Sequence, residues 1–198
     1  GLLAERKGSP MDKPRIAVML ADGTEPLEAI APIDAWRRGG VDAVTVSIMD
    51  GRDVRLAQDI LMTADFGLAD VDLNGFDGIL VPGGSAGVEA MAKCLPLADA
   101  LKAFMDTGKF VFSICAGPMV LNGLGLLEGK RVTCYPGCEE GFPAGSYVGY
   151  SGVVHDGNLV TASGPGFALD FALVCLSVMT TPADADEVAA DMLSTVKQ

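Results

Sequence analysis

Apolar residues follow two periodicities along the chain, one typical of buried strands and one typical of amphipathic helices. Runs rich in aliphatic and β-branched residues predict buried strands at 15–21, 41–49, 76–81, 109–114, 131–135 and 159–163. Apolar positions three or four residues apart predict helices at 24–38, 97–107, 116–121, 167–180 and 184–196. Short extended segments are expected around residue 54 and at 59–63, and a turn at 155–158 favours a hairpin.

The alternation of strands and helices predicts an α/β fold. Because the strands are almost wholly apolar, we expect a doubly wound, mostly parallel sheet with helices on both faces. Ligands of such sheets bind at the carboxyl ends of the strands, near the switch in strand order. Residues 22–28, 83–84 and 115–116 each follow a predicted strand, so we expect them to meet at one edge.

Cys115 is the first candidate for chemistry, because it lies at the corner between strand 109–114 and helix 116–121. A thiol at a helix N-terminus faces unpaired amides and the positive end of the helix dipole, which favour the nucleophilic thiolate. The corner is similar to a nucleophile elbow, although Ser113 replaces the first glycine of the Gly-x-nucleophile-x-Gly pattern. A small buried cysteine that fills a turn is the alternative.

Backbone amides near this corner are candidates for binding a substrate oxygen. Gly83 and Gly84 would let their amides approach it closely, next to the amide of Ala116, and together these amides would stabilise developing negative charge. The alternative for the Pro-Gly-Gly sequence is an ordinary turn.

Two carboxylates lie at the start of helix 24–38, where we expect Thr24 to be the N-cap. Glu25 is interpreted as a surface residue that complements the helix dipole. Glu28 has apolar neighbours in the sequence, so its pKa should be raised and it could hold a proton for Cys115.

Composition narrows the function classes. The 198 residues carry a formal net charge of −12, which argues against nucleic acid and anionic membrane surfaces as partners. Residues 1–10 precede Met11 and are interpreted as a leader left by expression cloning, with 11–198 as a single domain. No secretory signal follows Met11, and five cysteines is an odd number. We therefore expect free thiols and a cytoplasmic protein.

The remaining cysteines and the single histidine give weaker signals. Cys134 and Cys138 could form a metal site or a redox pair, but turn packing is favoured because no second cysteine pair or nearby histidine accompanies them. Cys94 and Cys175 are interpreted as helix-end and core residues. His155 is expected in a solvated turn, which leaves a cysteine peptidase without its usual general base. No nucleotide-binding motif is found, and we expect neither a cofactor nor a metal.

Several spaced motifs together resemble one family. They are Ala-Asp-Gly-Thr-Glu-Pro-Leu-Glu at 21–28, Val-Pro-Gly-Gly at 81–84, Ser-Ile-Cys-Ala-Gly-Pro at 113–118 and Ala-Ser-Gly-Pro-Gly-Phe-Ala-Leu-Asp-Phe-Ala at 162–172. In this order they are similar to the ThiJ/PfpI superfamily, specifically the branch of the parkinsonism-associated protein deglycase. The resemblance implies a flavodoxin-like sandwich, a homodimer, Cys115 as the reactive thiol and Glu28 as its acid partner.

The same resemblance implies cofactor-independent chemistry on α-oxoaldehydes such as methylglyoxal. This activity, described as glyoxalase III or deglycase, would form 2-hydroxy acids. The alternative is a redox-sensing or chaperone-like protein whose Cys115 is oxidised to sulfinate; a cysteine peptidase is less favoured. Two positions depart from the family. Tyr135 stands where some members have a histidine, and Gln58 stands where some have an arginine near the site across the dimer, so both are auxiliary candidates together with Glu25.

Overall fold

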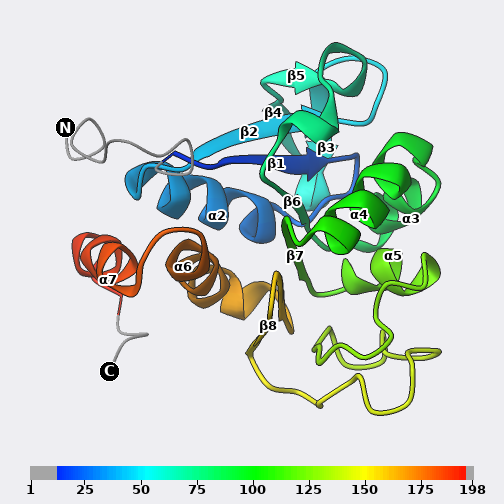
Figure 1. The fold of residues 1–198 in the computed structure, drawn as a ribbon. Coiled ribbons are helices and arrows are strands. Elements are labelled where there is room, and N and C mark those ends of the chain that lie inside the picture. Colours follow the sequence, from blue (N-terminus) through cyan, green and yellow to red (C-terminus); the bar gives the residue numbers. More distant parts are fainter. Residues whose placement is uncertain (1–12, 195–198) are drawn as a thin grey trace.

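The computed structural model describes residues 13–194 and shows an α/β sandwich around a seven-stranded sheet (Figure 1). The predicted leader at 1–10 lies outside the described residues. The sheet contains β1 (Arg15–Leu20), β2 (Asp42–Ser47), β5 (Phe66–Gly67), β6 (Gly78–Val81), β7 (Phe110–Ile114), β8 (Val153–Asp156) and β9 (Leu159–Ala162). A hairpin of β3 (Asp53–Leu56) and β4 (Ile60–Thr63) forms a second small sheet.

The strand order of the large sheet is β5-β2-β1-β6-β7-β9-β8, and all neighbours are parallel except β8 and β9. Within it, β2-β1-β6-β7-β9 has the flavodoxin-like order, so the predicted doubly wound fold is confirmed. The order reverses between β1 and β6. The carboxyl ends of β1, β6 and β7 therefore lie side by side at the position where such sheets bind ligands.

Helices cover both faces of the sheet (Figure 1). One layer contains α2 (Pro26–Arg38), α6 (Ala168–Met179) and α7 (Pro182–Asp191), with α6 packed between the other two. The opposite layer contains α3 (Ser85–Ala92), α4 (Leu95–Thr107) and α5 (Pro118–Gly123). Short 3₁₀ turns connect these elements at Ala57–Asp59, Leu68–Asp70, Leu73–Gly75 and Pro165–Phe167.

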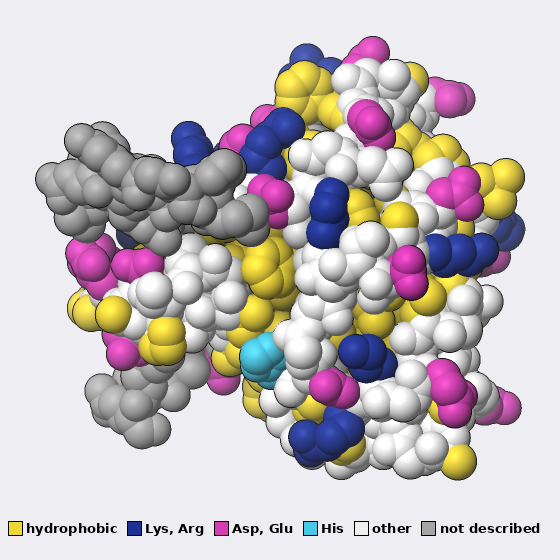
Figure 2. Space-filling model, in the orientation of Figure 1, with side chains coloured by type: hydrophobic (Ala, Val, Ile, Leu, Met, Phe, Trp, Pro, Cys, Tyr) yellow, Lys and Arg dark blue, Asp and Glu magenta, His cyan; other side chains and the backbone are white. Residues whose placement is uncertain are grey.

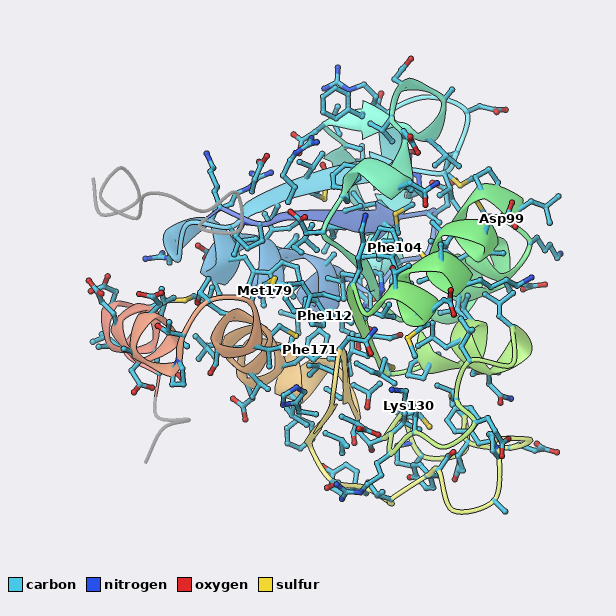
Figure 3. All side chains as sticks on the ribbon, viewed as in Figure 1. Asp99, Phe104, Phe112, Lys130, Phe171 and Met179 are labelled. Atoms are coloured by element: carbon cyan, nitrogen blue, oxygen red, sulfur yellow. The ribbon has the colours of Figure 1, made fainter. Side chains whose placement is uncertain are left out.

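Alternate side chains of each strand point into two separate hydrophobic cores, one on each face of the sheet, as the pleat of a sheet buried on both faces requires. Phe112 of β7 and Phe171 of α6 point toward one another on the α2/α6 side, whereas Phe104 of α4 fills the opposite side (Figure 3). Trp36 closes the first core, and its ring nitrogen donates a 2.9 Å hydrogen bond to the carbonyl of Ala172. This bond joins α2, which carries Glu28, to α6.

Three sequence predictions about elements were wrong. Residues 131–135 form only an isolated bridge, between Val132 and Tyr147, because the Val132 amide donates to Ser146 O and the Thr133 amide donates to the Thr161 hydroxyl instead of a strand carbonyl. Thr24 does not cap α2: its hydroxyl accepts a hydrogen bond from the Ala21 amide, and Glu25 is the N-cap instead. His155 lies in β8 rather than in the turn that follows.

The surface mixes both signs of charge. Figure 2 shows Lys and Arg side chains interspersed with Asp and Glu side chains over the face it presents. Within residues 13–194, no helix has the length and apolar character that a membrane crossing requires.

Candidate active site

Cys115 occupies a sharp turn between β7 and α5. Its φ of 64° lies in the left-handed region, which a non-glycine residue adopts at an energetic cost and which often marks functional sites. The turn is held by the Cys115 amide, which donates to Ala162 O at 2.9 Å, and by the Gly117 amide, which donates to Ile114 O at 2.9 Å. The thiol is partly exposed to solvent. The predicted elbow is therefore present.

Ser113 explains the departure from the glycine pattern at this elbow. Its hydroxyl is buried and donates a 2.9 Å hydrogen bond to Val81 O, joining β7 to the end of β6. A Cβ on Gly117 would collide with this hydroxyl and with Val81 O, so the second glycine is sterically required. The sequence singled out Ser113 only as an exception, and its bracing role was not predicted.

Glu28 reaches the same place from the first turn of α2. Its side chain is fully buried, and Oε1 accepts a 2.8 Å hydrogen bond from the Gly83 amide. Oε2 is buried without a hydrogen-bond partner among residues 13–194. Gly83 packs against both groups, because a Cβ on it would collide with Glu28 Oε1 and with Cys115 Cβ. The structure thus brings Glu28 and Cys115 together, as expected.

The three predicted oxyanion donors differ in availability. The Gly83 amide is already bound to Glu28, so the expectation that it would bind a substrate oxygen was wrong. The Ala116 amide is directed at the Cys115 sulfur, where it lowers the pKa of the thiol. No described residue accepts a hydrogen bond from the amide of Gly84. This glycine has a φ of 97° and lies against the backbone of Gly23 and Glu25. Gly84 and Ala116 remain as donor candidates.

Burial raises the pKa of Glu28 to about 7. The hydrogen bond from Gly83 and the contact with Cys115 oppose this shift, whereas the charge of Glu25 adds to it. The sequence prediction of a raised pKa is therefore confirmed, but its reasoning was incomplete. Leu27 and Ile30, the apolar neighbours on α2, are themselves exposed, and Glu28 is enclosed by the loop after β6 and the elbow after β7.

The expectation of a Cys115 thiolate was wrong for the unliganded site. Burial, followed by the negative charge of Glu28, raises the pKa of the thiol to about 12. Helix α5 begins only at Pro118, and the Gly117 amide is used within the turn, so the helix end offers the sulfur less stabilisation than a thiol at an N-cap receives. The thiol therefore keeps its proton near neutral pH, and the pair loses its first proton from Glu28 at about pH 7.

The auxiliary candidates Glu25 and Gln58 lie beside each other and are joined by a hydrogen bond. Glu25 Oε2 caps α2 by accepting from the Leu27 and Glu28 amides, and Gln58 Nε2 donates to Glu25 Oε1 at 3.3 Å. Glu25 therefore has a structural role, but as the N-cap of α2, a position that the sequence analysis assigned to Thr24. Gln58 has a positive φ of 58°, in the turn between β3 and β4.

Tyr135, Cys134 and Cys138 belong to a turn that is hydrogen-bonded to the elbow. The Tyr135 amide donates to Cys115 O at 2.9 Å, and the exposed ring of Tyr135 lies on the solvent side. Cys134 is fully buried, whereas Cys138 is half-buried, and its amide closes a turn onto Tyr135 O. Within residues 13–194, no group of three or more His, Cys, Asp or Glu side chains is placed to hold a metal ion.

His155 lies far from this edge. It pairs with Val160 in the β8–β9 hairpin, toward the amino end of β9, and its Nε2 bonds to Gly157 O at 2.7 Å. It is the single histidine of the chain, so the elbow has no imidazole beside it.

Comparisons with known proteins agree with this architecture. The family model described as the DJ-1/PfpI family matches residues 14–178. Protein dj-1beta of Drosophila melanogaster is 35% identical over 177 residues, which cover 89% of this chain and 95% of that protein. Protein DJ-1 homolog B of Arabidopsis thaliana is 36% identical over 180 residues, or 90% of this chain, but the match spans only 41% of that longer protein. The solved structure of oxidized Toxoplasma gondii DJ-1 has a TM-score of 0.88 and 33% identity, covering 92% of this chain and 99% of that one.

Proposed function

The chain belongs to the DJ-1/PfpI family, and we propose that it is a cofactor-independent cysteine enzyme that converts α-oxoaldehydes such as methylglyoxal into 2-hydroxy acids. One observation carries this proposal: a fully buried carboxyl with a free Oε2 faces a partly exposed thiol on a strained elbow. Such a pair can deliver a nucleophile and store its proton in the same step.

In the first step, Cys115 Sγ attacks the aldehyde carbon of the substrate while the thiol proton passes to Glu28. The sulfur–carbon bond forms, and the carbonyl π electrons move to the oxygen, which the amides of Ala116 and Gly84 would stabilise. Protonation of this oxygen gives a hemithioacetal. Glu28 is suited to this transfer because its pKa of about 7 lets it accept and return a proton near neutral pH.

In the second step, Glu28 removes the proton from the former aldehyde carbon and returns one to the neighbouring carbonyl carbon. The hydroxyl proton of the hemithioacetal passes to the oxygen of that neighbouring carbon through the enediol, so a thioester carbonyl forms next to sulfur and a hydroxyl forms on its neighbour. The carbon next to sulfur is thereby oxidised and its neighbour reduced, so no external redox cofactor is needed. The product is a thioester of Cys115, and water hydrolyses it to the 2-hydroxy acid and the free thiol. With an early adduct of the same aldehyde, Cys115 Sγ would displace the bound amine or thiol from the former aldehyde carbon. The sulfur–carbon bond forms, the bond to the amine or thiol breaks, and the released group leaves with the thiol proton, which is the deglycase form of the activity.

The test is a glutathione-free assay of lactate formation from methylglyoxal. Cys115→Ser should lose at least about a thousandfold in kcat/KM, because it removes the nucleophile. Cys94→Ser is the matched control: Cys94 is also a partly exposed thiol, but it lies at the start of α4, and this variant should keep wild-type turnover. Equal activity of Cys115→Ser and wild type would remove Cys115 from the mechanism.

A second candidate function is redox sensing through Cys115 sulfinate. The partly exposed sulfur has the Ala116 amide and the protonated Glu28 carboxyl beside it as donors for sulfinate oxygens. A relative, Toxoplasma gondii DJ-1, has been solved in an oxidized form. Intact-mass analysis after mild peroxide treatment separates the two functions. Gain of two oxygen atoms at Cys115, together with an absence of dicarbonyl turnover, would favour the sensor.

We further propose a homodimer in a reducing compartment such as the cytoplasm. Leu27 and Ile30 of α2 and Ile60 and Leu61 of β4 expose apolar surface, Leu61 to 68%, near the link between Glu25 and Gln58. The five free thiols support the compartment. Light scattering after size exclusion should give the dimer mass, and Leu61→Glu should shift it toward the monomer. Gln58 would then lie near the dimer boundary.

A further inference from the structure

A small apolar pocket lies beside the backbone of the elbow that carries Cys115 and is not used by the mechanism above. Its volume is about 190 Å³, and no charged side chain contributes to its lining. The lining residues come from three loops: Tyr135, Pro136, Tyr150, Ser163, Gly164, Pro165, Gly166 and Phe167. An apolar cavity of roughly 150 Å³ is large enough to hold benzene, so this pocket matches a single ring in size.

Three aromatic rings form the walls of this pocket. Tyr150 and Phe167 meet edge to face, with ring centroids 5.8 Å apart and an interplanar angle of 66°. The ring of Tyr135 is the third, and it lies close to Gly164, where an added Cβ would approach it to 3.4 Å. Aromatic walls in this arrangement offer ring faces and edges to a further aromatic group.

Backbone hydrogen bonds fix the pocket relative to Cys115. One wall is attached directly, because the Tyr135 amide donates to Cys115 O at 2.9 Å. The segment 163–167 begins one residue beyond Ala162, whose carbonyl accepts a hydrogen bond from the Cys115 amide. Ser163 is in turn tied to Gly152 by a 2.9 Å bond from its amide. The pocket is therefore a preformed space beside the elbow.

We propose that this pocket binds the substituent R of an α-oxoaldehyde R–CO–CHO and favours an aromatic R over a methyl group. The inference rests on the proposed function, because it assumes that the reacting aldehyde carbon sits at Cys115 Sγ. A carboxylate or phosphate on R would find no opposite charge in the lining, whereas a phenyl group would bury apolar surface against the Tyr135, Tyr150 and Phe167 rings. Arylglyoxals such as phenylglyoxal are the expected substrate class.

The test compares two alkylating ketones that differ only in R, namely 2-bromoacetophenone and bromoacetone. Each places an electrophilic carbon next to a carbonyl; Cys115 Sγ bonds to that carbon, bromide leaves, and the thiol proton passes to solvent. Labelling of Cys115 is followed by peptide mass mapping, and each rate is divided by the rate with free glutathione to remove intrinsic reactivity. The normalised aryl-to-methyl ratio should exceed about ten, since a fitted apolar group typically gains that much discrimination.

Two variants and one control make the test specific. Phe167→Ala should lower the normalised ratio about tenfold, and Tyr150→Ala should lower it severalfold. Tyr150 is 68% exposed, so Tyr150→Ala keeps the test decisive if Phe167→Ala fails to fold. Phe66→Ala removes an exposed aromatic ring from β5, at the far edge of the sheet, and should leave the ratio unchanged.

The outcomes separate this inference from the proposed function. If the wild type prefers the aryl ketone no more than free glutathione does, the aryl site is overturned even if methylglyoxal is turned over. An unchanged normalised ratio in folded Tyr150→Ala has the same meaning. A ratio that falls in the variants supports the site, even if neither methylglyoxal nor phenylglyoxal yields a hydroxy acid. In that second case the proposed enzymatic function alone is refuted.

Discussion

Glu28 faces Cys115 across the carboxyl edge of the sheet, so that a buried carboxyl and a thiol share one space. Burial contributes most to the raised pKa of the thiol, and the Glu28 carboxylate raises it further because two like charges there would repel. The amides of Gly83 and Ala116 stabilise the carboxylate and the sulfur, respectively. The pair therefore titrates as a unit that holds one proton over a wide range above neutral pH.

The first prediction concerns the pH dependence of turnover. Below an apparent pKa of about 7 the pair holds two protons, and Glu28 cannot accept the thiol proton. We expect kcat/KM for methylglyoxal to rise about tenfold per pH unit below that value and to level off above it. Initial rates between pH 5 and pH 9 would show this. A flat profile would mean that Glu28 does not act as the base.

The second prediction separates the two carboxylates of α2. Glu28→Gln keeps an acceptor for the Gly83 amide but cannot take a proton, so kcat should fall by about 10² to 10⁴ with the fold retained. Glu25→Gln is the matched control, since Glu25 caps the helix without reaching the thiol. It should cost about 1 kcal/mol of stability and change kcat little. Steady-state kinetics and urea unfolding of both variants decide; equal kcat losses would contradict the assignment.

The fold could be predicted from the sequence because its signals are local and repeated. β1 reads Arg-Ile-Ala-Val-Met-Leu and is buried at every position after Arg15, so a strand covered on both faces is apparent from composition alone. The strand expected at 131–135 failed for the complementary reason. Its residues have strand propensity, but pairing depends on distant partners, and only Val132 finds one.

The sequence predicted which residues form the site, but it did not predict the protonation state of the thiol. The sequence places Cys115 and Glu28 after parallel strands, and the carboxyl-edge rule brings them together. It does not show that the Gly83 amide would be taken by Glu28 or that α5 would begin three residues after the thiol. Both depend on tertiary contacts, as does the burial that contributes most to the raised pKa of the thiol.

The third prediction concerns Gly83, which packs against both reactive groups. Its backbone φ suits any residue, yet an added Cβ would collide with Glu28 Oε1 and Cys115 Cβ. Gly83→Ala should cost about 1 to 3 kcal/mol through overpacking and should lower turnover by displacing the carboxyl. Gly75→Ala is the control, because a Cβ there meets nothing within 4 Å and should change stability by less than about 1 kcal/mol. Equal stability and activity of the two variants would mean that the elbow tolerates a methyl group.

The fourth prediction links the buried carboxyl to folding. The folded protein holds the Glu28 proton up to about pH 7, whereas the unfolded chain releases it near the ordinary pKa of 4.5. The folded state therefore binds more protons between these values. The stabilisation that comes from this retained Glu28 proton is complete below about pH 4.5 and is lost as the pH rises through about 7. This loss amounts to at most about 3 kcal/mol.

Other groups also titrate across this range, so the wild type is compared with Glu28→Gln, which has no proton to lose at this position. Urea unfolding at pH 5, 6, 7 and 8 should show the stability of the wild type falling relative to the variant as the pH rises. The difference should stop changing above about pH 8, where Glu28 is ionised in both states. Parallel curves for the two proteins would mean that Glu28 is ionised in the folded protein throughout, and the thiol would then have no proton acceptor with a pKa near 7.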